Sequence, residues 1–112
     1  MARWIDRFSG FDWDKGNWPK CGKHGVSREE IEELFSLEPA IHPDTAHSER
    51  ETRFLAIGKT AAGRWVFAAF TIRQSGRKRK LRPISARYMH AKEIRHYENR
   101  EKGEDDSGSE NG

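Results

Sequence analysis

The chain of 112 residues has a single cysteine and no long apolar run. Cys21 therefore has no partner for a disulfide within the chain, which is consistent with a reducing cytoplasm. No apolar segment approaches the ~20 residues that a membrane-spanning helix needs. The first residues also lack the apolar core of a signal peptide. We therefore expect a cytoplasmic protein that does not enter a membrane.

Signatures of metal binding and of cysteine catalysis are also missing. The five histidines, beside a single cysteine, show no standard zinc-ligand spacing. No recognisable motif marks Cys21 as a nucleophile. We therefore expect neither a metal nor another cofactor.

Apolar side chains are scarce as well: 34% of the residues are hydrophobic and 35% are charged. A chain of this length and composition forms one domain with a small core, to which four Trp and six Phe contribute large buried areas. We expect this domain to span residues 1–100. Residues 101–112 include no apolar side chain and are predicted to be a disordered acidic tail.

The charge is divided unequally along the chain. Residues 1–97 carry 19 basic against 12 acidic side chains, a net charge of +7, whereas the segment from Glu98 onward has a net charge of −4. A basic body of this kind attracts polyanions, and nucleic acid is the first candidate. The alternative is a soluble basic protein without such a partner.

The order of the predicted elements indicates an α+β domain. Residues 1–8 look like a loose lead-in, and a first helix after them should be short or irregular because of Gly16, Pro19 and Gly22. Ser27 and Glu30 form a capping box at the start of a second helix. An antiparallel meander follows, with a short strand within 40–51 and strands at 52–59, 64–73 and 81–88. A last helix is expected at 90–99. The strand at 64–73 is nearly apolar on both faces, which predicts the centre of the sheet.

The stretch Arg77–Tyr97 has eight Lys or Arg residues and one acid, Glu93. Strict alternation in its strand places Pro83, Ser85 and Arg87 on one face, and Ile84, Ala86 and Tyr88 on the other. An arginine and a serine that project together from a rigid strand suit a phosphate, because the guanidinium fork matches the phosphate oxygens in pairs. The alternative is a solvated hairpin followed by a surface helix.

Lys23 and His24 lie on a predicted turn between two helices. A histidine can move protons near neutral pH, and a neighbouring lysine can hold a phosphate. The alternative is that both side chains only complement the dipole at a helix C-terminus.

The predicted strands also carry several arginines, of which Arg53 and Arg73 stand at strand ends that a curved sheet can aim into one concavity. Cleavage of RNA by its own 2′-hydroxyl needs a base, cations around the phosphate, and an acid for the leaving oxygen. Each arginine can equally serve solubility. Tyr88 and Tyr97 can stack on bases or donate protons, or can simply pack.

Short motifs follow one another along most of the chain. They are FDWD at 11–14, KHGVS at 23–27, HS at 47–48, RF at 53–54, IGKTAAGR at 57–64, FTIR at 70–73 and PISAR at 83–87. A capped helix leading to Phe35 and a closing helix with Tyr97 and Glu98 complete the order. In order and spacing, from about Phe11 to Glu98, the chain resembles the BrnT toxins of bacterial type II toxin–antitoxin systems.

The resemblance implies a RelE-like ribonuclease fold, with small helices packed on a twisted antiparallel sheet. It implies a metal-independent endoribonuclease toxin that cleaves mRNA and arrests growth. It also implies a BrnA-type antitoxin with a ribbon-helix-helix domain, through which alone the complex contacts operator DNA and represses its own operon.

Carried over by position, the resemblance implies a catalytic set of Lys23, His24, Arg53, Arg73, Ser85 and Arg87. In this set His24 transfers the proton, the arginines stabilise the phosphate and Lys23 orients it. Further RNA contacts are expected from Arg64, Lys80, Arg82, Tyr88 and Tyr97.

Two other functions remain open from the sequence. One is a non-catalytic nucleic-acid-binding or regulatory subunit that has kept the fold. The other is an interaction module whose basic face meets an acidic protein. Partner contacts are expected at Trp4, Phe8 and Trp18.

Overall fold

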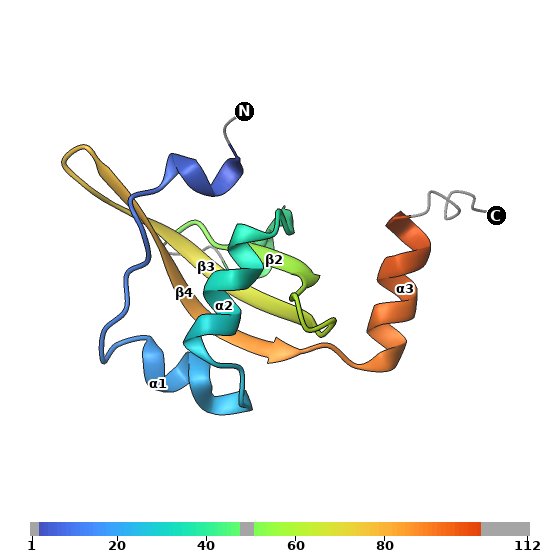
Figure 1. Ribbon diagram of the computed structural model, residues 1–112. Coiled ribbons are helices and arrows are strands. Elements are labelled where there is room, and N and C mark those ends of the chain that lie inside the picture. The colour runs from blue at the N-terminus through green and yellow to red at the C-terminus, as the bar shows by residue number, and fades with distance from the viewer. Residues whose placement is uncertain (1–2, 48–50, 102–112) are drawn as a thin grey trace.

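A four-stranded antiparallel sheet organises the chain (Figure 1). The computed structural model describes residues 3–47 and 51–101. The strands lie side by side in chain order: β1 (Ala40–Pro43), β2 (Phe54–Lys59), β3 (Trp65–Ser75) and β4 (Lys78–Tyr88). The predicted α+β class is confirmed, and so is the central place of β3 in the sheet. Ser48 and the acidic tail from residue 102 lie outside the described residues, so the domain boundary stays a prediction.

Short helices connect and flank the strands. In the described ranges they are η1 (Trp4–Arg7), α1 (Trp18–Cys21), η2 (Gly22–His24), α2 (Arg28–Ser36), η3 (Thr45–His47) and α3 (Ala91–Glu101), where η marks a 3-10 turn. Helix α1 has only four residues, as its proline and glycines predict. None of the helices in the described ranges is long and apolar enough to cross a membrane.

Helix α2 begins where its capping residue predicts. The Ser27 hydroxyl accepts a hydrogen bond from the Glu30 N–H at 3.1 Å, which satisfies one of the free donors at the helix start. The Glu30 carboxylate accepts a hydrogen bond from the hydroxyl of Tyr88 in β4. The first turn of α2 is therefore tied to the sheet as well as capped.

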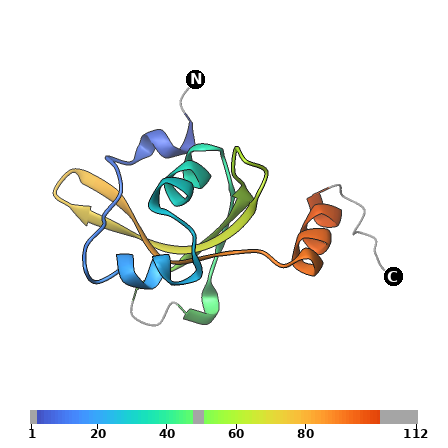
Figure 2. The ribbon, with the colours of Figure 1, turned by 60° about the horizontal axis from the view of Figure 1, so that its bottom comes forward.

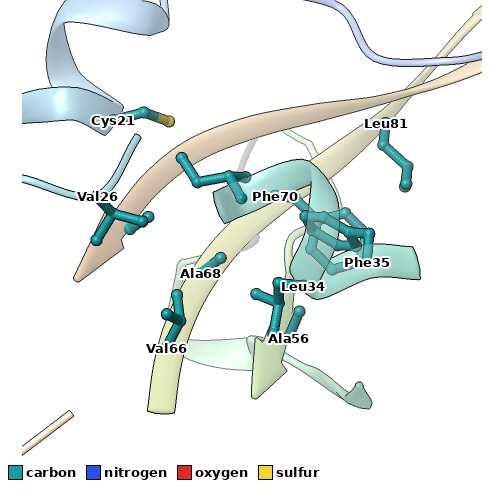
Figure 3. Close-up of a cluster of buried hydrophobic side chains, with 11 residues drawn as sticks. Cys21, Val26, Leu34, Phe35, Ala56, Val66, Ala68, Phe70 and Leu81 are labelled. Carbon is teal, nitrogen blue, oxygen red and sulfur yellow. The ribbon is translucent and has the colours of Figure 1, made fainter. Parts of the chain in front are cut away.

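The hydrophobic core lies between α2 and one face of the sheet, which we call the helix face (Figure 3). Helix α2 contributes Ile31, Leu34 and Phe35, and the Phe35 ring meets Phe70 of β3 edge to face at 5.0 Å. The strands contribute small side chains, among them three buried alanines. At Gly58 an added Cβ would lie 3.0 Å from Leu34 Cδ1, so the absence of a side chain at this position favours the close approach of the helix to the sheet.

The expectation of a loose lead-in is wrong for residues 4–8. Trp4 lies in η1 with its ring centroid 4.9 Å from Phe8 and 6.2 Å from Phe35. Both Trp4 and Phe8 pack against the core cluster, and Trp18 does so at α1. The aromatic residues that were expected to meet a partner thus complete a core that is short of aliphatic side chains.

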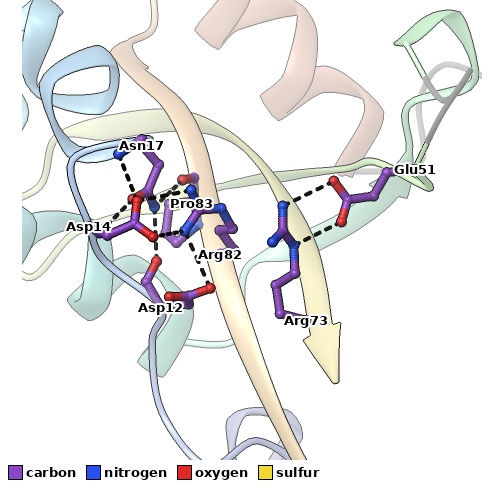
Figure 4. A network of polar contacts seen from close by, with 8 residues as sticks. Asp12, Asp14, Asn17, Glu51, Arg73, Arg82 and Pro83 are labelled. Atoms are coloured by element: carbon purple, nitrogen blue, oxygen red, sulfur yellow. Dashed lines mark hydrogen bonds and ion pairs between the residues drawn. The ribbon is translucent and has the colours of Figure 1, made fainter. Parts of the chain in front are cut away.

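The N-terminal segment then runs along the edge of β4. Backbone bonds join Ser9 to Arg79 at 2.7 Å and Asp12 to Leu81 at 2.8 Å. The buried side chain of Asn17 donates to the carbonyl oxygens of Asp12 and Pro83 at 2.9 and 2.8 Å (Figure 4). This contact holds the start of α1, and η2 directly after it, against β4.

An extra residue changes the phase of alternation within β4. Ala69 pairs with Ser85 while the next residue, Phe70, pairs with Pro83, so Ile84 has no partner on β3. Pro83 is consequently buried in the core, whereas Ser85 lies on the opposite face with Arg87. The prediction that Pro83 shares a face with Ser85 and Arg87 is wrong, because strict alternation does not allow for a bulge.

We expect Asn17→Ala to lower the free energy of unfolding by about 1–3 kcal/mol, since it leaves the buried Pro83 carbonyl without its donor. Urea unfolding followed by tryptophan fluorescence measures the change. Lys15→Ala, at an exposed position of the same loop, is the matched control and should alter stability by less than about 0.5 kcal/mol. Equal stability of the two variants would contradict the role given to Asn17.

Candidate functional site

The face of the sheet opposite α2, which we call the outer face, carries five of the eleven predicted site residues. Five cross-strand pairs of β3 and β4 point to it: Phe67 with Arg87, Ala69 with Ser85, Thr71 with Arg82, Arg73 with Lys80, and Ser75 with Lys78. Paired residues of antiparallel strands project on the same side. The outer face therefore presents cationic side chains from both ends of this strand pair.

One small cavity brings together three residues of the predicted catalytic set. His24, Ser85 and Arg87, with Phe67 and Ala86, line a hollow of about 200 Å³, which we call the His24 pocket. His24 comes from the exposed turn η2, and the other two from the second half of β4. Lys23 is exposed beside His24 on the same turn. Residues some 60 positions apart in the chain thus meet because Asn17 holds α1 against β4.

Arg87 is held in this pocket from two sides. Its two terminal nitrogens donate to the two carboxylate oxygens of Glu93, each at 2.9 Å. Its guanidinium carbon lies 4.9 Å from the centroid of the Phe67 ring, which is a cation–π contact. The hydrogen bond to Glu93 raises the pKa of Arg87. The guanidinium is therefore charged and fixed in orientation.

Sequence reasoning did not include Glu93 in the site. It lies in the first turn of α3, where it also accepts a hydrogen bond from the His90 N–H at 2.9 Å. The hydrogen bonds from Arg87 and then His90 lower the pKa of Glu93 from 4.5 to about 2. A signal was present, since Glu93 is the one acid among the eight cations of the basic stretch.

Arg73 and Lys80 lie apart from the His24 pocket. With Asp12, Ser75 and Lys78 they line a second hollow of about 260 Å³ near the β3–β4 turn, which we call the hairpin pocket. The Nε of Arg73 also donates to Glu51 at 2.9 Å (Figure 4). Arg53 directly precedes β2, and its carbonyl accepts from the Asp44 N–H. The structure thus places Arg73 in a different hollow from His24, Ser85 and Arg87, and Arg53 lines neither hollow.

Two of the predicted RNA-binding residues lie on the helix face. Tyr88 pairs with the core residue Val66, and the guanidinium of Arg64 stacks on its ring at 3.6 Å. Burial and the hydrogen bond to Glu30 raise the pKa of Tyr88. The thickness of the sheet separates Arg64 and Tyr88 from Ser85 and Arg87.

Arg82 and Tyr97 are engaged elsewhere. Arg82 donates to both carboxylate oxygens of Asp14 at 3.0 Å and lies 3.3 Å from Asp12, which locks the N-terminal segment onto β4 (Figure 4). Tyr97 belongs to α3, which stands away from the body of the molecule (Figures 1 and 2), and its ring centroid lies 5.6 Å from that of Trp65. It lines a mostly apolar groove of about 850 Å³ between α3 and the outer face.

Other chemistry is poorly served by the described part of the chain. Cys21 is fully buried, and burial raises the pKa of its thiol to about 11, so it is not a thiolate at neutral pH. Over residues 3–47 and 51–101, no group of three or more His, Cys, Asp or Glu side chains is placed to hold a metal ion.

The chain is a small α+β protein in which a histidine from η2 meets a serine and an arginine of β4 at one small pocket. Residues 13–93 match the family model described as the ribonuclease toxin, BrnT, of type II toxin–antitoxin systems. The match spans most of the chain, and the chain therefore belongs to this family. It is a ribonuclease toxin of a type II system, whose partner is a protein antitoxin. Comparisons with curated proteins and with solved structures give no match.

We expect the carboxyl group of Glu93 to titrate near pH 2. NMR of its side-chain carboxyl carbon as a function of pH measures this titration. Because its folded-state pKa lies below 4.5, the Arg87 pair stabilises the protein above that pH, and this contribution is lost as the pH falls towards 2. In Arg87→Ala the pKa of Glu93 should return towards 4.5. An unshifted titration in the unaltered protein would show that the pair does not persist in solution.

Proposed function

We propose that this toxin is an endoribonuclease that cleaves RNA, and mRNA in the cell, at the His24 pocket without a metal ion. One observation carries the proposal: His24, Ser85 and Arg87 line a single cavity although they come from distant parts of the chain. Side chains that transfer protons, donate hydrogen bonds and carry fixed positive charge are what cleavage by a neighbouring 2′-hydroxyl requires.

In the proposed reaction the 2′-oxygen attacks the adjacent phosphorus and the bond to the 5′-oxygen breaks. The products are a 2′,3′-cyclic phosphate and a free 5′-hydroxyl. His24 takes the proton from the 2′-hydroxyl and returns one to the leaving 5′-oxygen, because imidazole is the side chain that changes charge most readily near neutral pH. Arg87 and Lys23 offset the charge that develops on the pentacoordinate phosphate, and the Ser85 hydroxyl donates to one of its oxygens.

Glu93 uses two of the five N–H donors of Arg87, and Nη1 also donates to the Tyr88 carbonyl at 3.4 Å. The remaining donors stay directed by the same bidentate contact, which orients the guanidinium plane before RNA arrives. Pre-organised charge of this kind needs no rearrangement when the phosphate changes geometry. We therefore assign Glu93 as a residue that positions Arg87.

In the cell, we propose, this activity arrests growth in the cytoplasm until a BrnA-like antitoxin with a ribbon-helix-helix domain binds the toxin. The complex then represses its own operon through the antitoxin. Membership of a type II toxin family supports a protein antitoxin. The ribbon-helix-helix type and the operon control rest on the resemblance of the sequence motifs.

A second function is favoured by one observation. The charge of Arg87 is already balanced by Glu93, as it would be in a subunit that has kept the fold and binds nucleic acid without cleaving it. Cleavage assays separate the two functions, because the second predicts RNA binding with no product.

We expect the purified protein to cleave labelled RNA in the presence of EDTA and to leave 2′,3′-cyclic phosphate ends. His24→Ala should lower the cleavage rate about 100-fold or more, since it removes the proton-transfer group. Arg87→Ala should lower it about 100- to 1,000-fold, since it removes a fixed charge at the phosphate. Arg7→Ala, which removes an exposed charge from η1, is the control and should cleave normally. Full activity in both pocket variants would refute the site, and dependence on added Mg²⁺ would refute metal independence.

Expression of the chain alone should arrest bacterial growth, and co-expression of its antitoxin should restore it. Arg87→Ala should not arrest growth, because the cleavage step is lost, while it still co-purifies with the antitoxin. Colony counts after induction and affinity co-purification give the two readouts. If Arg87→Ala arrested growth as strongly as the unaltered toxin, the toxicity would not depend on the His24 pocket.

A further inference from the structure

The hairpin pocket is cationic and faces the same side as the His24 pocket. Arg73, Ser75, Lys78 and Lys80 belong to the cross-strand pairs that point to the outer face. Arg79 lies between the two lysines but stacks on the Phe8 ring at 5.2 Å, on the helix face. The alternation of side chains along the strands therefore places the cations of this hairpin on two different faces. Three of them, Arg73, Lys78 and Lys80, line one cavity of about 260 Å³.

Asp12, the one acid among the described residues that line this cavity, does not cancel its charge. Its carboxylate lies 3.3 Å from Arg82, whose side chain is only 11% exposed. Arg73 is paired with Glu51, but these two side chains are 50% and 42% exposed. An exposed ion pair contributes little to stability, so a phosphate can take the place of Glu51 at small cost.

The two pockets are too far apart to hold one phosphate. Lys80 pairs with Arg73, and Arg87 pairs with Phe67, six residues back along β3. At about 3.3 Å per strand residue the two cross-strand pairs lie roughly 20 Å apart. A single strand of RNA covers that distance with a few nucleotides.

We infer that the hairpin pocket is a second phosphate subsite, which binds the RNA backbone a few nucleotides away from the bond that is cleaved. The substrate then lies as a single strand along the β3–β4 ribbon. Arg73 and Lys80 bind this distant phosphate and do not act at the scissile one. The inference rests on the proposed ribonuclease activity at the His24 pocket.

The test compares a dinucleotide with an RNA of about ten nucleotides, a length within the range that single-strand sites cover. Arg73→Ala and Lys80→Ala should each raise KM for the longer RNA about ten-fold or more, because a charged hydrogen bond to phosphate is lost, and leave kcat unchanged. Neither change should affect cleavage of the dinucleotide. For the longer RNA, Lys80→Ala should also reduce the slope of log Kd against log salt concentration by about one.

Arg79→Ala is the matched control, since it removes the same charge from the same hairpin but from the helix face. It should leave KM for both substrates nearly unchanged. If KM for the longer RNA rose equally in Arg79→Ala, the effect would be a general electrostatic attraction, and the proposed subsite would be refuted. An equal loss on the dinucleotide and the longer RNA would place Arg73 at the scissile phosphate instead.

If the unaltered protein cleaves neither substrate, the proposed activity fails, and fluorescence anisotropy with the same two RNAs still tests the subsite. Tighter binding of the longer RNA that is lost in Arg73→Ala and kept in Arg79→Ala would support it. Equal affinity of all three proteins for the longer RNA would overturn it.

Discussion

The extra residue at Ile84 decides which side chains of β4 enter the core and which reach the outer face. Before the bulge, Leu81 and Pro83 point to the core; after it, Ser85 and Arg87 point to the opposite side. Without the bulge, one continuous alternation would bury a serine or expose a core residue. The hydrophobic packing of α2 and the arrangement of the His24 pocket both depend on this single change of phase.

The two faces of the sheet use their cations differently. On the helix face, the guanidinium groups of Arg64 and Arg79 stack on aromatic rings. At the edge of β4, Arg82 holds the N-terminal segment through two aspartates. Arg73 and Lys80 instead line a hollow on the outer face. A net positive charge is therefore only a first indication of a site for polyanions, because several of the cationic side chains support the fold instead.

Local patterns in the sequence predicted the elements and the family well. The capped helix α2, the short α1 and the central strand β3 follow from capping chemistry, from glycine and proline, and from an apolar run. Motifs at fixed spacing identified the family, which the match to residues 13–93 confirms. The lead-in was misjudged, because whether Trp4 packs at a core depends on contacts far along the chain.

The composition of the site and its spatial division have different origins. The sequence by itself determined which side chains are available for phosphate chemistry, because residue type sets charge, hydrogen-bonding capacity and proton transfer. Only the tertiary structure decided that His24 meets Ser85 and Arg87, that Glu93 holds Arg87, and that Arg73 lies in another pocket. The reason is physical: these relations depend on a bulge, on the docking of α1 through Asn17, and on the contact that Glu93 of α3 makes with Arg87. The bulge interrupts the alternation of side chains along β4, and the other two contacts join residues from different elements of the fold. The local pattern of residues in the sequence predicts neither kind of feature.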